Sequence, residues 1–486
     1  MPTLWHVRAG TLTCPRACGA RRTFWLVSGP VALCVDIGST YTKGVAVDLD
    51  TGAILGTADH RTTIESDVMV GLAAVRRELA GVARDPLLLI CSSAGGGLRL
   101  AVVGYEREIS SEAGHRAALS AGARVVHVSA GRLDAAGLAA LLEAAPDVVL
   151  LVGGTDGGES SVLLHNSAAL ASAGMAVPVV VAGNAHVRRE VCAQLERCGV
   201  TVVATANVLP DIGELDPEPA RAAIRGVFLD HVIGGKGLSA DPGFAGLVRA
   251  VTPDAVLDGV AVLAEGLRTP TDAAASHGQS AGSVVVIDVG GATTDVYCVL
   301  SPDAEQAMLG REAVGVPSHR RTVEGDLGLR WSAEALLAAA VDERLLTQSE
   351  RASLAGWVAA RREVSGPPAS EADRANELRM AGLAVMIALR RHVRAETAYG
   401  VTGTTGASAR SASTVVLSGG AIRHASPAER DALIAIVLGD RGGARSVLLD
   451  AEVRRDSRYV LAAAGLLAKD FPAAAGGLVR AGGLLG

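Results

Sequence analysis

The sequence has little of what marks a membrane protein or a nucleic-acid-binding protein. No run of 18 or more apolar residues is free of charges and repeated glycines, so no transmembrane helix is predicted. Aromatic residues make up 3% of the 486 residues, no basic cluster is interleaved with them, and the formal net charge is −6. We therefore expect neither nucleic acid nor an anionic membrane surface as a partner.

Cysteine is also scarce. The seven cysteines are odd in number and scattered, which is typical of small buried side chains in a reducing compartment. Residues 1–30 lack the continuous apolar segment of a secretory signal, and we expect them to be a disordered or mis-annotated extension, with translation starting near Val31. The protein is accordingly expected to be cytoplasmic.

The remaining composition is that of a globular chain with an ample core, because 49% of the residues are hydrophobic and 20% are charged. Short apolar runs alternate with segments of helical period, which predicts parallel βαβ units and an α/β fold. We expect strands at 33–36, 44–47, 53–57, 87–91, 98–103, 124–128, 148–152, 177–182 and 200–204. Helices are expected between them at 68–79, 111–121, 135–143, 160–173 and 187–198. The predicted domains are a first α/β lobe at 31–206, a proline-rich helical insert or connector at 207–280 and a second lobe at 281–486.

Residues 31–48, VALCVDIGSTYTKGVAVD, read as a strand, a turn of small and hydroxyl residues, and a second strand. Asp36 at the strand end can hold hydrated Mg²⁺, which takes only one or two protein carboxylates. Gly38 lets the backbone turn with its N–H groups toward an anion. The other candidate phosphate ligands are Ser39, Thr40, Thr42 and Lys43, the last being one of only three lysines. An ordinary β-hairpin is the alternative for this segment taken alone.

The same order of residues returns at 283–299, about 250 residues further on, with Asp288 at the end of the first strand. Each hairpin can offer a carboxylate to a metal and an amide-lined turn to phosphate. Together they predict a clamp that closes on one Mg-nucleotide, with Asp36 and Asp288 as metal ligands. The phosphate-binding candidates of the second hairpin are Gly290, Gly291, Thr293 and Thr294.

Two further glycine turns follow apolar runs. One holds Gly153, Gly154, Thr155 and Asp156. Ligands of open α/β sheets bind beyond the carboxyl ends of the strands, so this turn either lines the nucleotide cleft or simply caps the next helix. The other holds Ser418, Gly419 and Gly420, where paired glycines let the backbone approach a ring or a ribose closely. The segment 322–330 adds two acids, one of them Glu324, in a glycine-punctuated loop.

In combination these motifs resemble those of known ATPases. Asp36-x-Gly-Ser-Thr-x-Thr-Lys43, Asp288-x-Gly-Gly-Ala-Thr-Thr-Asp295 and Ser418-Gly-Gly-Ala421 resemble the phosphate-1, phosphate-2 and adenosine motifs of the actin, heat-shock chaperone and sugar-kinase superfamily. The segments 151–158, 289–295, 324–328 and 456–467 are more specifically similar to the glutamate mutase accessory protein family, MutL or GlmL. Serine at position 418 departs from the usual Gly-x-Gly-Gly of the adenosine motif.

The resemblance implies an α/β, two-lobed actin-like ATPase fold with RNase H-like lobes, α/β and helical insertions, and Mg-ATP between the lobes. It implies an ATP-dependent accessory or reactivating chaperone of an adenosylcobalamin-dependent mutase, whose subunits are the expected partners; a homodimer is a further candidate assembly. Asp288 would act in catalysis, and Glu324 or Asp295 would orient the attacking water. The spacing around His231 differs from Asp-x-His-x-x-Gly, so no cobalamin is expected on a histidine ligand.

Two other functions stay open at this point. One is a metabolic kinase of the same fold that acts on a small hydroxy or carboxylate substrate. The other is a nucleotide-gated assembly scaffold that counts as a mutase component and does not depend on hydrolysis.

Overall fold

The structure is a computed structural model that describes residues 29–64, 66–94, 98–105, 114, 118, 123–212, 214–228, 230, 238–241, 243–267, 283–300, 319–361, 368, 370–398, 408–442, 447–448 and 451–485. Most of the expected extension, the expected helix at 111–121 except for Gly114 and Ala118, and His231 lie outside these ranges.

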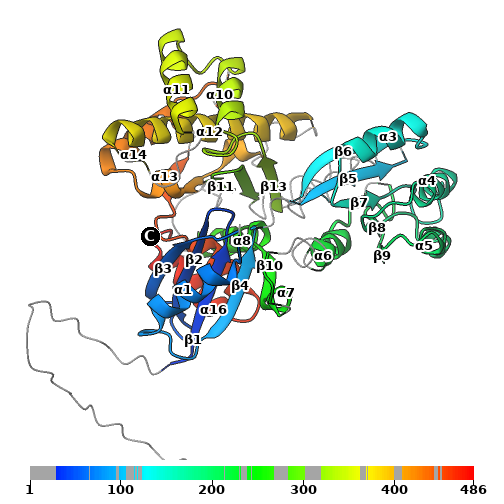
Figure 1. Ribbon diagram of the computed structural model, residues 1–486, viewed down its shortest axis with the longest axis horizontal. Helices are drawn as coiled ribbons and strands as arrows, with labels where there is room; N and C mark the ends of the chain where they lie inside the picture. Colours follow the sequence, from blue (N-terminus) through cyan, green and yellow to red (C-terminus); the bar gives the residue numbers. More distant parts are fainter. Residues whose placement is uncertain are drawn as a thin grey trace, which may run out of the picture.

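Three five-stranded sheets organise the described chain (Figure 1). The first sheet contains β1 (Val31–Ile37), β2 (Tyr41–Asp48), β3 (Ile54–Arg61), β4 (Leu87–Ser92) and β10 (Val248–Val251). The second contains β11 (Val284–Val289), β12 (Thr294–Val299), β13 (His319–Glu324), β14 (Thr414–Gly419) and β15 (Glu452–Arg455). The third contains β5 (Arg99–Gly104), β6 (Arg124–Ala130), β7 (Val148–Leu151), β8 (Val179–Val181) and β9 (Val202–Ala204).

The first two sheets have the same topology. In each, an antiparallel meander of three strands is followed by two parallel strands beside the first strand, in the orders β3-β2-β1-β4-β10 and β13-β12-β11-β14-β15. This repeated unit confirms the two RNase H-like lobes of an α/β, actin-like fold. The two hairpins that the motifs predicted, β1–β2 and β11–β12, occupy equivalent places in the two lobes.

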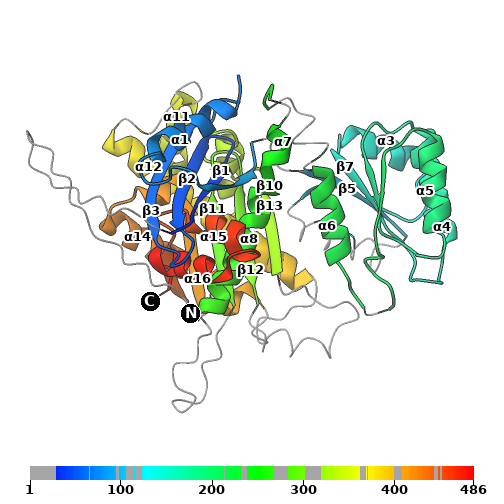
Figure 2. The same cartoon turned by 90° about the horizontal axis from the view of Figure 1, so that it is seen from below.

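The third sheet is parallel throughout and lies beside the two lobes (Figures 1 and 2). Its order, β6-β5-β7-β8-β9, is that of a doubly wound flavodoxin-like sheet. It belongs to an α/β insertion, because the chain leaves the first sheet after β4 and rejoins it at β10. The strands expected within 31–206 thus divide between two sheets, and where the domains begin and end stays a prediction.

One strand was not expected from the sequence. β10 falls in the region 207–280, where only helices were predicted. Its four residues are too few to show a period of two, and its position follows from pairing with β4 rather than from local pattern. Besides a long helix at Thr252–Leu267, the helices that the structure describes in this region and in the insertion are α3 (Ala135–Glu143), α4 (Ser161–Ser172), α5 (Arg188–Arg197), α6 (Glu218–Val227) and α7 (Phe244–Leu247).

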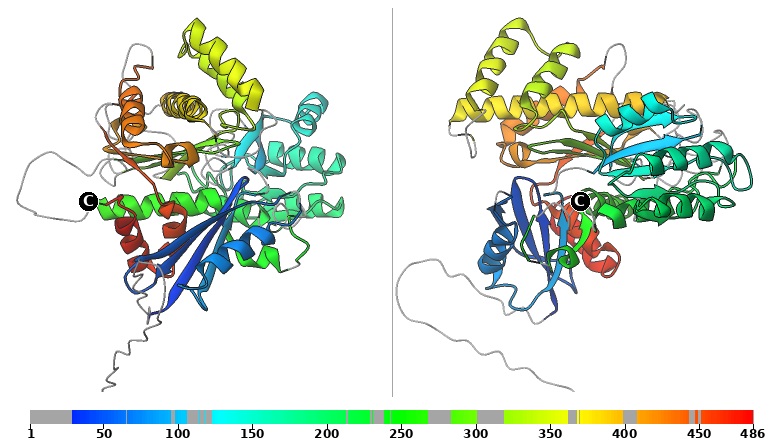
Figure 3. Two further views of the ribbon diagram at one scale, coloured as in Figure 1. Left: turned by 60° about the vertical axis from the view of Figure 1, so that its left-hand side comes forward. Right: turned by 45° about the vertical axis from the view of Figure 1, so that its right-hand side comes forward.

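Two helices fill the space between the lobes. α8 (Thr252–Leu267) runs from the first sheet toward the second, and α15 (Val460–Ala468) packs against it before α16 (Pro472–Ala481) returns to the first lobe (Figure 3). The crossing is very close: a Cβ on Gly259 would lie 2.0 Å from the carbonyl oxygen of Leu461, and one on Gly465 would lie 1.7 Å from that of Ala255. Only glycine permits this approach of the two backbones.

The outer faces of the lobes are covered by other helices. α1 (Met69–Leu79) packs on the first sheet, and the long α12 (Glu371–Ala398) packs on the second. The second lobe also carries α10 (Ala333–Asp342), α11 (Gln348–Arg361), η2 (Ala409–Ser411), α13 (Gly420–Arg423) and α14 (Pro427–Leu438). No helix within the described ranges has the length and apolar character needed to span a membrane.

Candidate functional site

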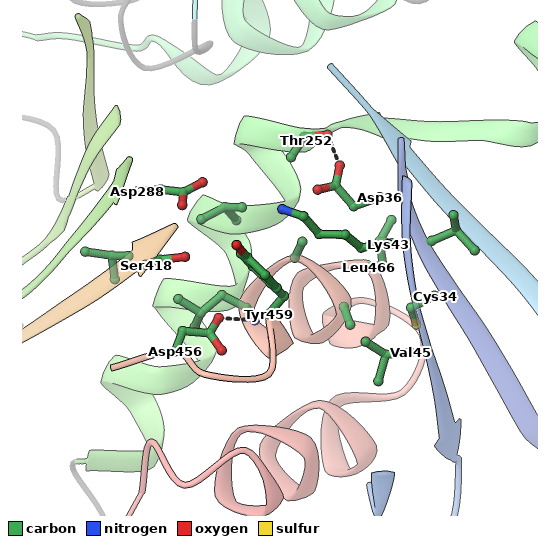
Figure 4. Close-up of a pocket in the computed structure, with 16 residues that line it drawn as sticks. Cys34, Asp36, Lys43, Val45, Thr252, Asp288, Ser418, Asp456, Tyr459 and Leu466 are labelled. Carbon is green, nitrogen blue, oxygen red and sulfur yellow. Dashed lines mark hydrogen bonds between the residues drawn. The ribbon is translucent and has the colours of Figure 1, made fainter. Parts of the chain in front are cut away.

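Strand alternation places Asp36 and Lys43 of the first hairpin and Asp288 of the second on the sheet faces that lie opposite each other between the lobes. In the first lobe, Cys34 on β1 and Val45 on β2 belong to the core between the lobes, and Asp36 and Lys43 share their faces. In the second lobe, Val286 belongs to the same core, so Asp288, two residues further along β11, faces the first lobe. Figure 4 shows the side chains of Asp36, Lys43 and Asp288 converging from the two sheets.

A small cavity lies where they converge. Its lining comes from both lobes and from the helices between them, and its volume is about 30 Å³, enough for water but far less than a nucleotide occupies. The polar lining residues are Asp36, Lys43, Thr252, Asp288, Ser418, Asp456 and Tyr459. We call the region around this cavity, between the two lobes, the cleft; as it stands it is too small to hold a nucleotide.

Lys43 lies at the centre of this group. Its Nζ lies 3.6 Å from the centroid of the Tyr459 ring, a cation–π contact. Burial by itself lowers the pKa of the Lys43 ammonium, but neighbouring acidic groups outweigh this and its pKa is raised. The groups responsible are the Tyr459 phenol and the carboxylates of Asp36 and Asp288. Lys43 is thus held protonated between carboxylates of opposite lobes.

The two carboxylates differ in their surroundings. Burial raises the pKa of the Asp288 carboxyl, and this is opposed by the charge of Lys43 and by a hydrogen bond from the Ser418 hydroxyl. The carboxylate of Asp36 accepts a hydrogen bond of 2.5 Å from Thr252 Oγ1. Most of the cavity lining is apolar, and Lys43 is the cation among its polar residues. The carboxylates of Asp36 and Asp288 are hard oxygen donors of the kind that Mg²⁺ prefers, so these two residues fit a magnesium ion.

The glycine turns of the two hairpins have the same construction and lie against each other. Gly38 N–H donates to the carbonyl of Tyr41 at 3.1 Å, and Gly290 N–H donates to that of Thr293 at 2.8 Å. A Cβ placed on Gly291 would lie 3.2 Å from Thr40 Oγ1. Thr40 Oγ1 is itself buried with no hydrogen-bond partner among the described residues. A hydroxyl in this state is suited to donate to an anion between the turns.

Three of the predicted side chains point away from the cleft. Thr42 is fully buried on the α1 side of its sheet, where its Oγ1 lies 3.1 Å from Thr62 Oγ1. Thr294 Oγ1 donates to the Leu327 carbonyl at 2.7 Å, and Glu324 forms an ion pair of 2.7 Å with Arg391 of α12. Each lies one residue out of phase with the inner face of its strand.

The remaining residues of the second hairpin and of the adenosine motif stay close to the cleft. Asp295 is the cross-strand neighbour of Asp288 and forms an ion pair of 2.7 Å with Arg321, while Thr293 Oγ1 donates to it at 3.2 Å. The residues after β14 turn sharply, since Gly419 has a φ of 121° and its Cβ would lie 2.4 Å from the Val289 carbonyl oxygen. Ser418 and Gly420 flank this turn, and Ser39 lies half-buried in the first one.

The turn after β7 is not brought to the cavity. Gly153 and Gly154 have φ values of 143° and 69°, and Thr155 and Asp156 follow them in the α/β insertion. The Asp156 carboxylate accepts hydrogen bonds from the Ala185 N–H at 2.8 Å and from the Asn207 side chain at 2.9 Å. The polar groups of this turn are therefore engaged in holding neighbouring loops together.

The start of α15 contributes two residues to which the sequence assigned no role. The carboxylate of Asp456 accepts the N–H groups of Val460 at 3.1 Å and Leu461 at 3.3 Å, which caps the helix. Tyr459 has φ 54° and ψ 43°, a left-handed conformation that is strained for an aromatic residue. An acid shortly before an apolar helical run was a visible capping signal, but contact of Tyr459 with Lys43 depends on the tertiary fold.

A second group of potential metal ligands lies between α12 and β12. Cys298, His392 and Glu396 are buried with ligand atoms within 4.8 Å of one another. The guanidinium of Arg320 already bridges two of them, at 3.3 Å from the Cys298 sulfur and 2.6 Å from a Glu396 oxygen. The guanidinium of Arg320 thus already balances the negative charge of Glu396 in this cluster.

Two lobes of equal topology, each bringing the acidic strand end and glycine turn of a hairpin to one cleft, define an actin-like two-lobed protein. The family model described as MutL protein matches residues 32–481. Protein MutL of Clostridium tetanomorphum is 35% identical over 454 residues, which cover 90% of this chain and 96% of that protein. The chain belongs to the MutL family, which confirms the resemblance carried by the motifs.

Similar solved structures include the activator of 2-hydroxyisocaproyl-CoA dehydratase from Clostridium difficile with bound ADPNP, at 11% identity and a TM-score of 0.28, covering 91% of this chain and 95% of that one. The ethanolamine utilization protein EutJ from Carboxydothermus hydrogenoformans is 11% identical with a TM-score of 0.28, covering 94% and 90%. A ROK family glucokinase from Streptomyces griseus in complex with glucose and AMPPNP is 12% identical with a TM-score of 0.27, covering 93% and 99%. Similarity at this level carries no argument about function.

Proposed function

We propose that this protein is an ATP-dependent accessory protein that reactivates or assembles an adenosylcobalamin-dependent mutase. The observation that carries the proposal is the convergence of Asp36 and Asp288, from equivalent strands of the two lobes, on one cavity that also holds Lys43. Membership of the MutL family, whose motifs resemble those of glutamate mutase accessory proteins, supports the mutase as the partner.

In this proposal the carboxylates of Asp36 and Asp288 hold Mg²⁺, which neutralises phosphate charge when it is bound. Backbone N–H groups of the two turns other than those of Gly38 and Gly290, which donate within their turns, bind phosphate oxygens together with the hydroxyl of Thr40. The backbone after Ser418 approaches the nucleoside. These groups position and neutralise the phosphates, which is the larger part of catalysis in phosphoryl transfer.

Lys43 has a separate role. In the closed cleft its ammonium is neutralised by carboxylates and stacked on Tyr459. Because its raised pKa keeps it charged, it can exchange these contacts for a phosphate oxygen without a change of protonation. Lys43 therefore balances the negative charge of Asp36 and Asp288 when no metal ion is bound between them.

The helix α8 packs against strands of both sheets, so a rotation of one lobe relative to the other changes the packing of α8. We infer that the closed and open forms present different surfaces to the mutase. A mutase that binds one form more tightly would be bound or released according to the nucleotide, favouring exchange of damaged cobalamin for intact cofactor.

The test is to measure Mg-dependent ATP hydrolysis by the purified chain and recovery of a cobalamin-inactivated mutase with and without ATP. The proposal predicts slow hydrolysis by the chain alone and recovery only with ATP, and it predicts that Asp288→Asn abolishes both. Absence of recovery together with ADP formation that requires a small acceptor would instead establish a metabolic kinase. Recovery that depends on ATP but survives the loss of hydrolysis would establish a nucleotide-gated scaffold.

A further inference from the structure

The carboxylate of Asp36 is held from the two strand ends at which the α/β insertion is attached. Thr252 is the first residue of α8 and directly follows β10, and its hydroxyl donates to Asp36 Oδ1 at 2.5 Å (Figure 4). Cys91 is the penultimate residue of β4 and lies in register with Asp36, and its thiol donates to the same oxygen at 3.7 Å. The insertion lies between β4 and β10 in the chain, so both contacts come from its points of attachment.

The second lobe holds its own acid in a different way. Ser418 lies in register with Asp288 on the neighbouring strand and donates its hydroxyl to that carboxylate, so it corresponds to Cys91. The residue that follows β15, the counterpart of β10, is Asp456, which caps α15. An acid thus stands where the first lobe has Thr252. The contact made by Thr252 is a feature of the lobe that carries the insertion, and it does not follow from the repeated topology.

The two contacts fix the orientation of the Asp36 carboxylate. Within the described part of the chain both of them reach Oδ1, which leaves Oδ2 for a metal ion. A carboxylate can otherwise rotate about its Cβ–Cγ bond, and partners that orient a ligand in this way raise the affinity of a site for its metal. The hydroxyl is the stronger of the two partners, because a thiol is a weak donor and lies further away.

The same end of α8 is bound to α6 by two ion pairs. Arg225 Nε lies 2.5 Å from an oxygen of Asp254, and Arg221 Nη2 lies 3.6 Å from an oxygen of Asp258. Both the two arginines and the two aspartates are four residues apart, so the helices are joined at two successive turns. The Asp254 side chain is only 1% exposed. Its charge must therefore be balanced within the protein, and Arg225 does so at hydrogen-bond distance.

The helix α6 is itself part of the insertion. It packs against β8 and β9 of the third sheet, on the side of the insertion that faces the lobes (Figure 2). Asp254 lies two residues after Thr252, in the first turn of α8. A movement of the insertion therefore acts on this first turn. A displacement of about 1 Å is enough to stretch the hydroxyl contact to Asp36 beyond the usual length of a hydrogen bond.

We propose that Thr252 is a positioning residue for the magnesium ligand Asp36, and that the α/β insertion controls this contact through the ion pairs between α6 and α8. The inference rests on the proposed function, because it names how the same site is regulated. A partner that displaces the insertion releases the carboxylate of Asp36 and weakens the binding of Mg-ATP. Because such coupling is reciprocal, Mg-ATP in turn favours one position of the insertion.

The first experiment measures the affinity of the full chain for ATP by isothermal titration with and without Mg²⁺; the ratio is the magnesium-dependent gain. Thr252→Val removes the hydroxyl and keeps the shape of the side chain, whereas Thr252→Ser keeps the hydroxyl. Thr62→Val is the matched control, because it removes a buried hydroxyl that lies 3.1 Å from Thr42 Oγ1, away from the cleft. We expect Thr252→Val to lower the gain roughly tenfold, and Thr252→Ser and Thr62→Val to preserve it. Thermal midpoints without nucleotide show the cost of losing a buried hydroxyl by itself.

The second experiment tests control by the insertion. Arg225→Gln removes the shorter ion pair to α8, and Arg189→Gln removes the same charge from an exposed position of α5 in the insertion. We expect Arg225→Gln to lower the gain roughly threefold and Arg189→Gln to leave it unchanged. The double variant with Thr252→Val should lose no more than Thr252→Val alone, because Arg225 acts through Thr252. Arg221→Gln, which removes the longer ion pair, replaces Arg225→Gln if that variant does not fold, with a smaller loss expected.

The outcomes separate this inference from the proposed function. A gain that survives in Thr252→Val, or that falls equally in Thr62→Val, would overturn the positioning role; loss of the gain in Asp36→Asn would still support the magnesium site. An effect of Arg225→Gln that adds fully to that of Thr252→Val, or that Arg189→Gln reproduces, would overturn control by the insertion. An unaltered chain whose affinity for ATP does not increase with Mg²⁺ would overturn both the inference and the proposed function.

Discussion

The crossing of α8 and α15 makes a sharp prediction about a single methyl group. In Gly465→Ala the new Cβ would lie 1.7 Å from the Ala255 carbonyl oxygen, whereas real Cβ atoms keep 3.0 Å or more from such an atom. The two helix backbones must therefore separate by more than 1 Å in the core between the lobes. Overpacking of this kind costs about 1–3 kcal/mol.

The expected sign is opposite to the usual effect of this substitution. Replacing glycine by alanine inside a helix ordinarily stabilises by roughly 0.5–1 kcal/mol, because alanine loses less backbone entropy. Gly476 in α16 is a matched control, since a Cβ there meets no atom within 4 Å. We expect Gly476→Ala to raise the thermal midpoint and Gly465→Ala to lower it.

Differential scanning calorimetry of the full chain measures both midpoints. The Gly465→Ala chain should also show a smaller stabilisation by Mg-ATP, because the altered crossing changes how the lobes meet. A Gly465→Ala midpoint equal to or above that of Gly476→Ala would refute the reasoning, since it would mean that the helices do not cross in contact at this residue.

Three further predictions concern other parts of the molecule. Tyr459→Leu removes the ring under Lys43 and should lower the unfolding free energy measured in urea titrations by about 1–2 kcal/mol. Tyr459→Phe keeps the cation–π contact and should lower it by less than half as much. Equal losses in the two variants would contradict the contact. Burial lowers the pKa of His392, but interactions with Cys298 and Glu396 outweigh burial and raise the pKa to about 9. Protonated His392 therefore stabilises the fold fully below pH 6.5, and this stabilisation is lost as the pH rises to 9. Its upper limit is on the order of 3 kcal/mol. His392→Gln should flatten this part of the stability–pH curve, and an unchanged slope would speak against it. Asp156→Ala should destabilise the chain by about 1–3 kcal/mol, because the Ala185 N–H and the Asn207 side chain lose their acceptor. The affinity for ATP in equilibrium dialysis should stay unchanged. Loss of ATP binding by a folded variant would show that this turn is part of the nucleotide site.

The sequence predicted the paired hairpins well because their chemistry is local. Asp36 and Asp288 each follow an apolar run and precede a glycine turn, and both lie where the pattern put them. The expected helix at 135–143 has the same bounds in the structure. Thr42 and Thr294 were assigned to phosphate by their hydroxyls alone. The strand β2 begins at Tyr41, earlier than the pattern indicated, and alternation then turns Thr42 away from Lys43.

Other features could not be predicted because they depend on contacts between distant segments. Tyr459 meets Lys43 across more than 400 positions of sequence, and no local pattern indicates that pair. Glu324 lies in a glycine-punctuated acidic loop that suggested catalysis, but its position opposite Thr294 in the sheet turns it toward Arg391. The glycine turn at Gly153 has the expected form, and only the topology reveals that it belongs to the α/β insertion.

The central claim is that Asp36 and Asp288, contributed by different lobes, hold the same magnesium ion with ATP. Isothermal titration of ATP with and without Mg²⁺, on the unaltered chain, Asp36→Asn, Asp288→Asn and the double variant, tests it directly. We predict that each single variant loses the magnesium-dependent gain in affinity and that the double variant loses little more, a departure from additivity of about 1–3 kcal/mol. Strictly additive losses, or a magnesium-dependent gain that survives in the double variant, would contradict the claim.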